Sequence, residues 1–199
     1  MRRRLRRIAI ISAALASTGL VVFGAPSAQA TSSVIYNGGF EDGESGWMDS
    51  WSVIGSAPHH HAINNGLRYR SHTGTWKAEL GGEGFGGYGF YGQQSIFRTV
   101  TLEPKTSYIL SYWLYVTPRT TGFRQLEVTA SVDGQVYQLD YRTNKDANTG
   151  YERVQVHLPQ DLVSTTEKRV KISFVAKEDE FNTSPFLIDD VALFPVEGS

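Results

Sequence analysis

Cysteine is absent from this sequence of 199 residues. The lack of thiols excludes disulfide bonds, metal sites built from thiolates and a cysteine nucleophile. A folded domain must therefore be stabilised by the burial of apolar side chains, to which a cation held by oxygen ligands could contribute.

The signature motifs of common enzyme classes are missing as well. There is no G-x-S-x-G elbow, no H-E-x-x-H pair, no phosphate-binding loop and no dinucleotide fingerprint. The acidic run at 178–180 lies between two expected strands, which favours a solvated turn over the paired carboxylates of a glycosidase. Asp189 and Asp190 are adjacent, so in a strand they would face opposite sides and could not flank one bond. We therefore expect no catalytic activity.

A run of three histidines, His59, His60 and His61, is the one cluster that suggests a transition metal. Neighbouring side chains in an extended segment alternate in direction, so at most two of the three could easily share one ion. We interpret the run as solvated loop residues. A zinc or copper site, which imidazole suits, stays open as the alternative.

The first thirty residues have the composition of a secretory signal peptide. Five arginines precede an apolar stretch without charge, which runs from Ile8 to Ala25. Pro26 and the pattern Ala28-Gln29-Ala30 then provide a site that a signal peptidase accepts. The apolar stretch is also borderline in length for a membrane anchor, which is the alternative interpretation. We predict cleavage of residues 1–30 and a secreted, extracellular protein.

Cleavage would change the charge of the chain. The full sequence has 19 Lys and Arg against 20 Asp and Glu; without the five N-terminal arginines, 14 basic and 20 acidic residues give a net charge of −6. Such a surface argues against nucleic acid or a membrane as the partner. The remaining stretch, 31–199, suits one domain with a core at about 34–194, too short for two. We expect a monomer.

Short segments in which apolar and polar residues alternate dominate this stretch. A period of two is typical of β-strands, and no segment has the apolar stripe and caps of a helix. The pair Asp133-Gly134 is a hairpin signal between two such segments. Together these features predict an all-β fold, an antiparallel β-sandwich. The expected strands cover 108–116, 126–132, 136–139, 151–158, 170–175 and 186–194.

The segment from Gly81 to Gly92 contains seven glycines and four aromatic residues among its twelve positions. Glycine permits tight turns and cannot pack, so we expect a loop or a strand edge. Its aromatic side chains either fold back on the sandwich, the interpretation that we favour, or form a platform that faces a ligand.

Four short motifs, in this order and spacing, carry a family resemblance. The set resembles the galactose-binding-like jelly rolls, and within them the carbohydrate-binding modules related to families 4, 9 and 22. It is also similar to the sandwich domains appended to secreted bacterial peptidases. The resemblance spans nearly the whole stretch from Thr31, and a match of fold does not by itself define a function. The motifs are Asn37-Gly38-Gly39-Phe40-Glu41 with Gly46-Trp47, the stretch 74–82, the stretch 94–102 leading to Tyr108, and Phe186-Leu187-Ile188-Asp189-Asp190-Val191.

The resemblance also implies a structural calcium ion (Ca²⁺). In a jelly roll the first and last strands can lie side by side, so we expect Glu41 and Asp189 to converge. Two carboxylates without a basic partner repel each other, and a divalent cation with six to eight oxygen ligands relieves that repulsion. The alternative is that both cap strand ends or pair with Arg or Lys. Carried over from the family, the ligands would be the carbonyl oxygens of Gly39, Thr73 and Trp76 and the carboxylates of Glu41 and Asp189.

Aromatic side chains that could stack on a sugar are plentiful. Trp47 and Trp76 are expected to pack in the interior. Within 108–116, Tyr112 and Trp113 point to opposite sides of the strand; one side is core and the other can line a binding face, and the sequence leaves open which. The candidate sugar-binding residues are Tyr88, Tyr91, Tyr112, Tyr137 and Arg142.

These features predict a secreted, non-catalytic binding module for a polysaccharide or glycan, stabilised by calcium. The alternative is a secreted protein-interaction or structural domain that binds no sugar.

Overall fold

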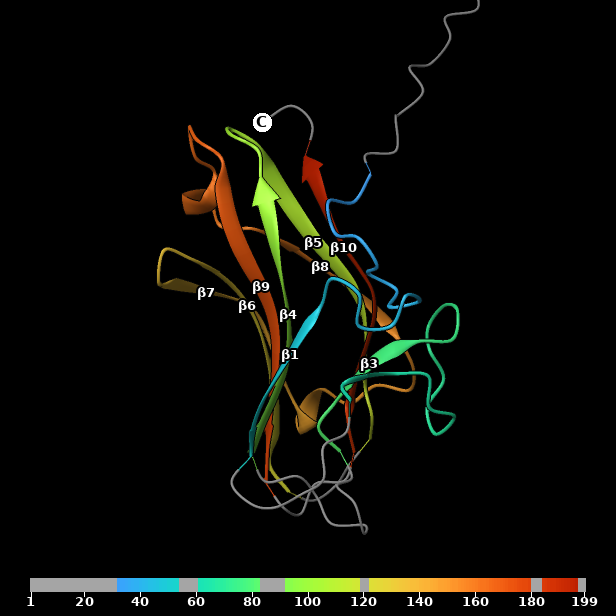
Figure 1. Cartoon of the computed structure of the whole chain (residues 1–199). Coiled ribbons are helices and arrows are strands. Elements are labelled where there is room, and N and C mark those ends of the chain that lie inside the picture. The colour runs from blue at the N-terminus through green and yellow to red at the C-terminus, as the bar shows by residue number, and fades with distance from the viewer. Residues whose placement is uncertain (1–31, 54–60, 83–91, 119–121, 180–183, 197–199) are drawn as a thin grey trace, which may run out of the picture. The chain divides into compact units, whose positions relative to one another are not determined.

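The computed structural model describes residues 32–53, 61–82, 92–118, 122–179 and 184–196. Over these ranges the chain forms ten strands and two short 3-10 turns, with no helix long and apolar enough to cross a membrane. The strands make two antiparallel sheets that face each other (Figure 1). The predicted all-β antiparallel sandwich of the jelly-roll type is confirmed. The predicted signal peptide lies outside the described residues and stays a prediction.

Each sheet has five strands. Sheet A has the order β1 (Met48–Val53), β4 (Gly92–Leu102), β9 (Lys168–Glu178), β6 (Arg124–Val132) and β7 (Gln135–Thr143). Sheet B has the order β2 (Ile63–Asn64), β3 (Lys77–Leu80), β10 (Phe186–Val196), β5 (Ser107–Val116) and β8 (Glu152–His157). The 3-10 turns are η1 (Asn144–Asp146), after β7, and η2 (Gln160–Leu162), after β8.

The core fills the space between the sheets. In β6 every second side chain from Arg124 to Val132 is buried, Leu126 and Val128 among them, so the period of two selects the inward residues. Trp47 packs here as predicted, 5% exposed, with its ring 5.1 Å from Phe40 and 6.5 Å from Phe174. Complete burial of one large apolar side chain stabilises the fold by about 1.5–3 kcal/mol, so these contacts hold the two sheets together.

Strand β4 is not among the strands predicted from the sequence. Polar residues at its inward positions hide the alternation that would have predicted it. Gln94 and Arg98 occupy positions where the alternation requires apolar side chains. The Gln94 side chain, 3% exposed, accepts a hydrogen bond of 2.8 Å from the backbone N–H of Gly81. The guanidinium of Arg98 lies 5.9 Å from the Trp47 ring and donates to the carbonyl oxygen of Tyr36. Both side chains satisfy backbone groups of neighbouring segments.

The segment before Gly39 runs along β10, as expected for the two ends of a jelly roll. The backbone N–H of Val34 donates to the carbonyl oxygen of Leu193 at 2.9 Å, and that of Val191 donates to Gly38 at 2.9 Å. A Cβ on Gly38 would lie 1.7 Å from the carbonyl oxygen of Val191, so only glycine permits this approach. The contact fixes the N-terminal motif beside the C-terminal one.

Candidate functional site

The outer face of sheet A carries many polar side chains on strands β4, β9, β6 and β7, alongside Phe97, Val175 and Val136. Alternate residues of β4, β9 and β6 are buried in the core, so their neighbours point outward, and the pairing with β6 identifies the outward residues of β7. Gln125 and Lys177 face each other across β6 and β9, and Glu127 faces Tyr141 across β6 and β7. These four side chains, which we call the polar row, come together only through the strand register.

The polar row is held by hydrogen bonds among its own members. The Tyr141 hydroxyl donates to Oε1 of Gln125 at 3.1 Å, and Nε2 of Gln125 donates to Oε1 of Glu127 at 2.9 Å. Nζ of Lys177 lies 3.4 Å from the same Glu127 oxygen. Tyr141 is 42% exposed, so its ring is open to solvent beside groups that accept and donate hydrogen bonds. An open ring fixed beside polar groups can bind a ligand with both an apolar side and hydroxyls.

A shallow groove of 530 Å³ lies on the same face, near the turn between β6 and β7. Arg169 and Lys171 of β9 line it together with Thr99, Ser131 and Asp133. The turn itself contains Asp133 and Gly134, both at positive φ, and confirms the predicted hairpin. The groove thus continues the polar face toward that hairpin with two basic side chains.

Sequence reasoning missed the whole polar row. The alternation of β6 identifies Gln125 and Glu127 as outward, but only the pairing of β6 with β7 and β9 places Tyr141 and Lys177 beside them. A search for outward polar residues in consecutive strands would have pointed to this face.

Tyr112 is a correction to the predicted sugar-binding set. It is 0% exposed and packs edge-on against Phe174 at 5.1 Å, so its ring cannot stack on a sugar. Its hydroxyl donates to Oδ2 of Asp140 at 2.7 Å. Burial, followed by the charge and hydrogen bond of Asp140, raises the pKa of this phenol far above its ordinary value.

Of the other predicted sugar-binding residues, Tyr137 and Arg142 contact other side chains of the domain, and the remaining two lie outside the described residues. Tyr137 is half-buried and packs against the core from β7. Nε of Arg142 donates to the Asp140 carboxylate at 2.9 Å, so Tyr112 and Arg142 meet at one acid. Tyr88 and Tyr91 lie outside the described residues, as do His59 and His60, whereas His61 is exposed and pairs with Glu44 at 2.7 Å.

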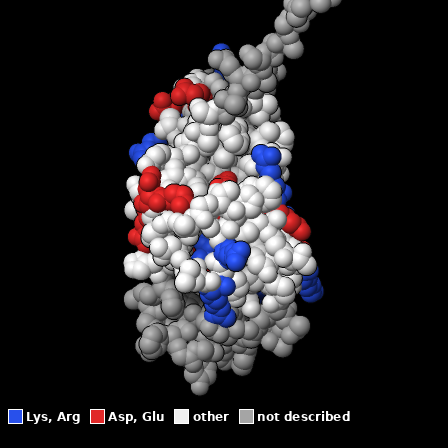
Figure 2. All heavy atoms as spheres, turned by 90° about the vertical axis from the view of Figure 1, so that its right-hand side faces the viewer, with Lys and Arg blue, Asp and Glu red and all other residues white. Residues whose placement is uncertain are grey.

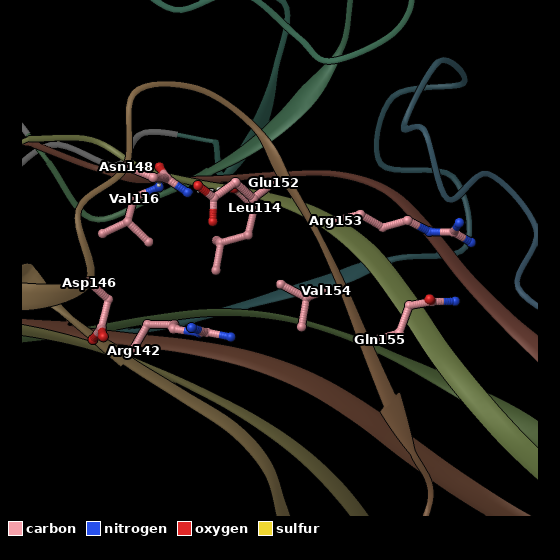
Figure 3. A pocket seen from close by; sticks show the side chains of 9 residues that line it. All are labelled: Leu114, Val116, Arg142, Asp146, Asn148, Glu152, Arg153, Val154 and Gln155. Atoms are coloured by element: carbon pink, nitrogen blue, oxygen red, sulfur yellow. Dashed lines mark hydrogen bonds between the residues drawn. The ribbon is translucent and has the colours of Figure 1, made fainter.

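Arg142 lines a cleft of 230 Å³ between the edge strands β7 and β8. Figure 3 shows Arg142 and Asp146 on one side of this cleft and Glu152 on the other, above the apolar side chains of Leu114 and Val154. Burial lowers the pKa of Arg142, but the hydrogen bond that Arg142 donates to Asp140 and the charges of Asp140 and Asp146 outweigh it and raise the pKa. Its charge is therefore compensated inside the protein.

The expected convergence of Glu41 and Asp189 occurs at the turn formed by residues 72–76. The Glu41 carboxylate accepts hydrogen bonds of 2.9 Å from the backbone N–H groups of Thr75 and Trp76. Oδ2 of Asp189 accepts from the N–H groups of His72 at 2.8 Å and Thr73 at 3.2 Å. Trp76 is half-buried and packs against the core, as predicted. One turn therefore receives carboxylates from both ends of the domain.

Asp190 was misjudged from the sequence. Its φ of +47° and a register irregularity after Asp189 break the alternation of β10. As a result both acids reach the same turn: Asp190 bonds Nδ1 of His72 at 2.6 Å and the Thr73 hydroxyl at 2.6 Å. The expectation that Asp189 and Asp190 face opposite sides is wrong for this reason.

The oxygen atoms around this turn are of the kind that a hard cation prefers as ligands. Asp189 is 0% exposed, and burial raises its pKa to about 6, although the backbone N–H groups of Asp190, Thr73 and His72 favour the ionised acid. The charge of this carboxylate also acts on the buried side chain of Lys77. A Cβ on Gly39 would lie 3.2 Å from Oδ1 of Asp190, and one on Gly74 would lie 2.2 Å from Oε1 of Glu41. The backbone thus passes directly beside each carboxylate. No group of three or more His, Asp or Glu side chains in the described ranges is placed to hold a metal ion, so backbone carbonyls would have to complete the ligand set.

Comparison with known proteins places the fold. Neither a protein family nor a curated protein matches the sequence. Among solved structures, an apo cyclase from Fischerella sp. is similar with a TM-score of 0.54 and 16% identity, covering 84% of this chain and 97% of the cyclase. The tailspike protein 4 domain of bacteriophage CBA120 is similar with a TM-score of 0.53 and 14% identity. The match covers 82% of this chain but only 21% of that chain.

Carbohydrate-binding modules are also among the structural neighbours. A family 61 module determined with β-1,4-galactotriose has a TM-score of 0.48 and 18% identity, with 83% of this chain and 100% of the module covered. Modules of families 16 and 22 occur as well. At such identities likeness defines the sandwich fold alone, so the function must be argued from the site.

Proposed function

We propose that this protein is a secreted, non-catalytic module that binds a glycan on the outer face of sheet A. The observation that carries the proposal is the polar row, in which an exposed tyrosine ring is fixed beside an amide, a carboxylate and an ammonium group. A sugar presents an apolar face of C–H groups, which stacks on an aromatic ring, and hydroxyls, which need both donors and acceptors. The polar row offers both.

Pre-organisation strengthens the proposal. Glu127 accepts from both Gln125 and Lys177, so these long side chains are already held before a ligand arrives. A ligand then loses less affinity to the ordering of side chains. The resemblance of the opening and closing motifs to carbohydrate-binding modules supports the same function.

We further propose that calcium stabilises the module at the turn formed by residues 72–76. The carboxylates of Glu41 and Asp189 and the carbonyl oxygens of Gly39, Thr73 and Trp76 would hold it. The bound ion would compensate the buried charge of Asp189 and fasten the N-terminal segment to β10.

A binding screen tests the proposal. The full chain is expressed with its N-terminal segment, the product is collected from the culture medium, and its first residue is determined; Thr31 is the expected start. Binding to soluble and insoluble polysaccharides is then measured for the wild type, Tyr141→Ala and Glu127→Gln. Both variants should lower affinity about tenfold. Gln155→Ala, an exposed residue of β8 on the other sheet, is the control and should bind as the wild type does. Absence of glycan binding, or equal loss in the control, would contradict the proposal.

A further inference from the structure

The outer face of sheet A has a charge opposite to that of the rest of the domain. Arg169, Lys171 and Lys177 all project outward from β9, since the residues between them alternate into the core. Among the outward residues of β4, β9, β6 and β7, Glu127 is the one acid. The four strands of this face therefore carry three outward basic residues against one acidic, with Asp133 in the turn between β6 and β7 as a second acid nearby, whereas residues 31–199 as a whole are acidic.

Two of these positive charges are not compensated. Lys177 is paired with Glu127 at 3.4 Å. Arg169 and Lys171 form no ion pair within the described part of the chain; the Lys171 ammonium instead lies 5.1 Å from the centre of the Phe97 ring. A cation–π contact holds the ammonium in place but leaves its charge available to a ligand.

These two cations line the 530 Å³ groove with the hydroxyl-bearing residues Thr99 and Ser131. They are two residues apart on one strand, so their Cα atoms are about 7 Å apart and their side chains point the same way. Asp133, at the hairpin, is the single acid that lines the groove. An anionic group bound between Arg169 and Lys171 would receive charge-assisted hydrogen bonds from both.

Figure 2 shows the side of the molecule that carries β3, where both acidic and basic side chains lie on a mostly uncharged surface and several of the basic ones gather in its lower half. In the cleft between β7 and β8, Asp140 already binds Arg142. Because residues 31–199 are acidic as a whole, a polyanion is favoured where basic residues outnumber acidic ones, as they do on the strands of the outer face of sheet A.

From this charge pattern we infer that the ligand of the outer face is an acidic glycan, with a carboxylate or sulfate group bound in the groove between Arg169 and Lys171. The inference rests on the proposed glycan-binding function and adds the substrate class. One sugar unit stacks on Tyr141 and bonds the polar row. Lys171 lies four residues from Val175, the β9 residue in register with Glu127, so the groove is about 13 Å further along the sheet. The anionic substituent therefore belongs to another unit of the same chain and selects acidic over neutral chains. A polysaccharide fits better than a nucleic acid, because the face offers an exposed tyrosine and a row of hydrogen-bonding groups but only two cations without an ion pair.

Paired ligands test the inference. Affinity is measured for soluble oligogalacturonate and for its carboxyl-reduced, neutral counterpart, and in a second arm for dextran sulfate and dextran. We expect the wild type to bind at least one anionic member about tenfold more tightly than its neutral partner, and to lose that preference as salt is raised. The arm that shows the preference identifies the group as carboxylate or sulfate. Duplex DNA of similar charge should bind more weakly.

A charge-matched pair of variants locates the effect. Arg169→Gln with Lys171→Gln removes both groove cations and should abolish the preference for the acidic ligand. Lys145→Gln with Arg153→Gln removes the same charge at exposed residues of η1 and β8 and should leave the preference within twofold of the wild type.

The outcomes separate the two proposals. Equal or tighter binding of the neutral ligands, weakened by Tyr141→Ala, would overturn the acidic preference and leave glycan binding intact. Binding of DNA as tightly as of the acidic glycan, or equal loss in both charge variants, would also overturn it. No binding to any glycan would refute both.

Discussion

Oδ2 of Asp189 lies 2.8 Å from the backbone nitrogen of His72, which precedes it by 117 residues. The hydrogen bond joins the turn at residues 72–76 to the last strand, and the His72 ring then stacks on Trp113 of β5 at 3.8 Å. Asp189 thus connects the turn at residues 72–76 to strand β10 of sheet B, and it is also a proposed calcium ligand.

Calcium should raise the thermal stability of the protein. Ligand binding to the folded state alone adds about 2.7 kcal/mol when the free ion is at one hundred times its dissociation constant. We expect melting temperature to rise between excess chelator and millimolar calcium for the wild type, and to stay constant for Asp189→Asn. Asp161→Asn, an exposed acid in η2, should respond as the wild type does. A wild type without any shift would rule the site out.

The calcium-free protein should lose stability through Asp189 as the pH rises. Burial raises the pKa of this carboxyl to about 6 in the folded protein, above its ordinary value of 3.8, so the folded state holds the proton more tightly than the unfolded chain does. The contribution is present in full below pH 3.8 and is lost as the pH rises through 6. Urea midpoints in chelator should show the wild type losing stability relative to Asp189→Asn between pH 4 and pH 7. A pH-independent difference between the two proteins would contradict the shift.

Gly74→Ala should be far more destabilising than Gly134→Ala. Both glycines have positive φ, +56° and +81°, so either substitution costs about 1–2 kcal/mol of backbone strain. At Gly74 the new Cβ would also lie 2.2 Å from the Glu41 carboxylate, whereas at Gly134 nothing lies within 4 Å. Urea unfolding should therefore show a second, larger loss only for Gly74→Ala, together with a weaker calcium response. Equal losses would show that Glu41 is not packed against this turn.

Tyr112→Phe should lower stability at neutral pH and reduce the sensitivity to alkali. The lost hydrogen bond to the half-buried Asp140 should cost about 1–3 kcal/mol. Because the folded protein keeps the Tyr112 phenol neutral, ionisation in the unfolded chain above pH 10 destabilises the wild type, by about 1.4 kcal/mol at pH 11. Unfolding free energies at pH 8 and pH 11 measure both effects. The control Tyr141→Phe, exposed on the outer face, should change the pH 8 value by less than about 0.5 kcal/mol.

Arg124→Leu should be strongly destabilising. The guanidinium is fully buried, lies 4.7 Å from the Phe186 ring, and donates to the backbone carbonyls of Thr117, Ser184 and Pro185. Removal of these donors leaves buried acceptors unsatisfied, and we expect a loss of about 3 kcal/mol or more. Calorimetry should show less than about 1 kcal/mol for Arg153→Leu, whose side chain is exposed on β8. A small loss at Arg124 would mean that water replaces the guanidinium.

Much of the fold could be predicted from local sequence. The alternation within 126–132 and 170–175 predicts β6 and β9 and their inward residues, and Asp133-Gly134 predicts the turn between β6 and β7. The motifs at 37–41 and 186–191 predict that the two ends of the domain meet. These features depend on neighbouring residues and on a fixed two-residue period, which the sequence displays directly.

Tertiary structure alone decided which side of each strand is functional. Segment 108–116 has large side chains on both sides, so its alternation did not indicate which side faces the core. In the structure Tyr112 is buried in the core, and the Trp113 ring stacks with that of His72. The irregularity after Asp189 reversed the expected direction of Asp190. The polar row exists only because strand register aligns Tyr141, Glu127 and Lys177 from three strands. Sequence by itself determined the strands and the meeting of the domain's two ends; pairing between distant strands, which depends on contacts across the sheet, determined the site.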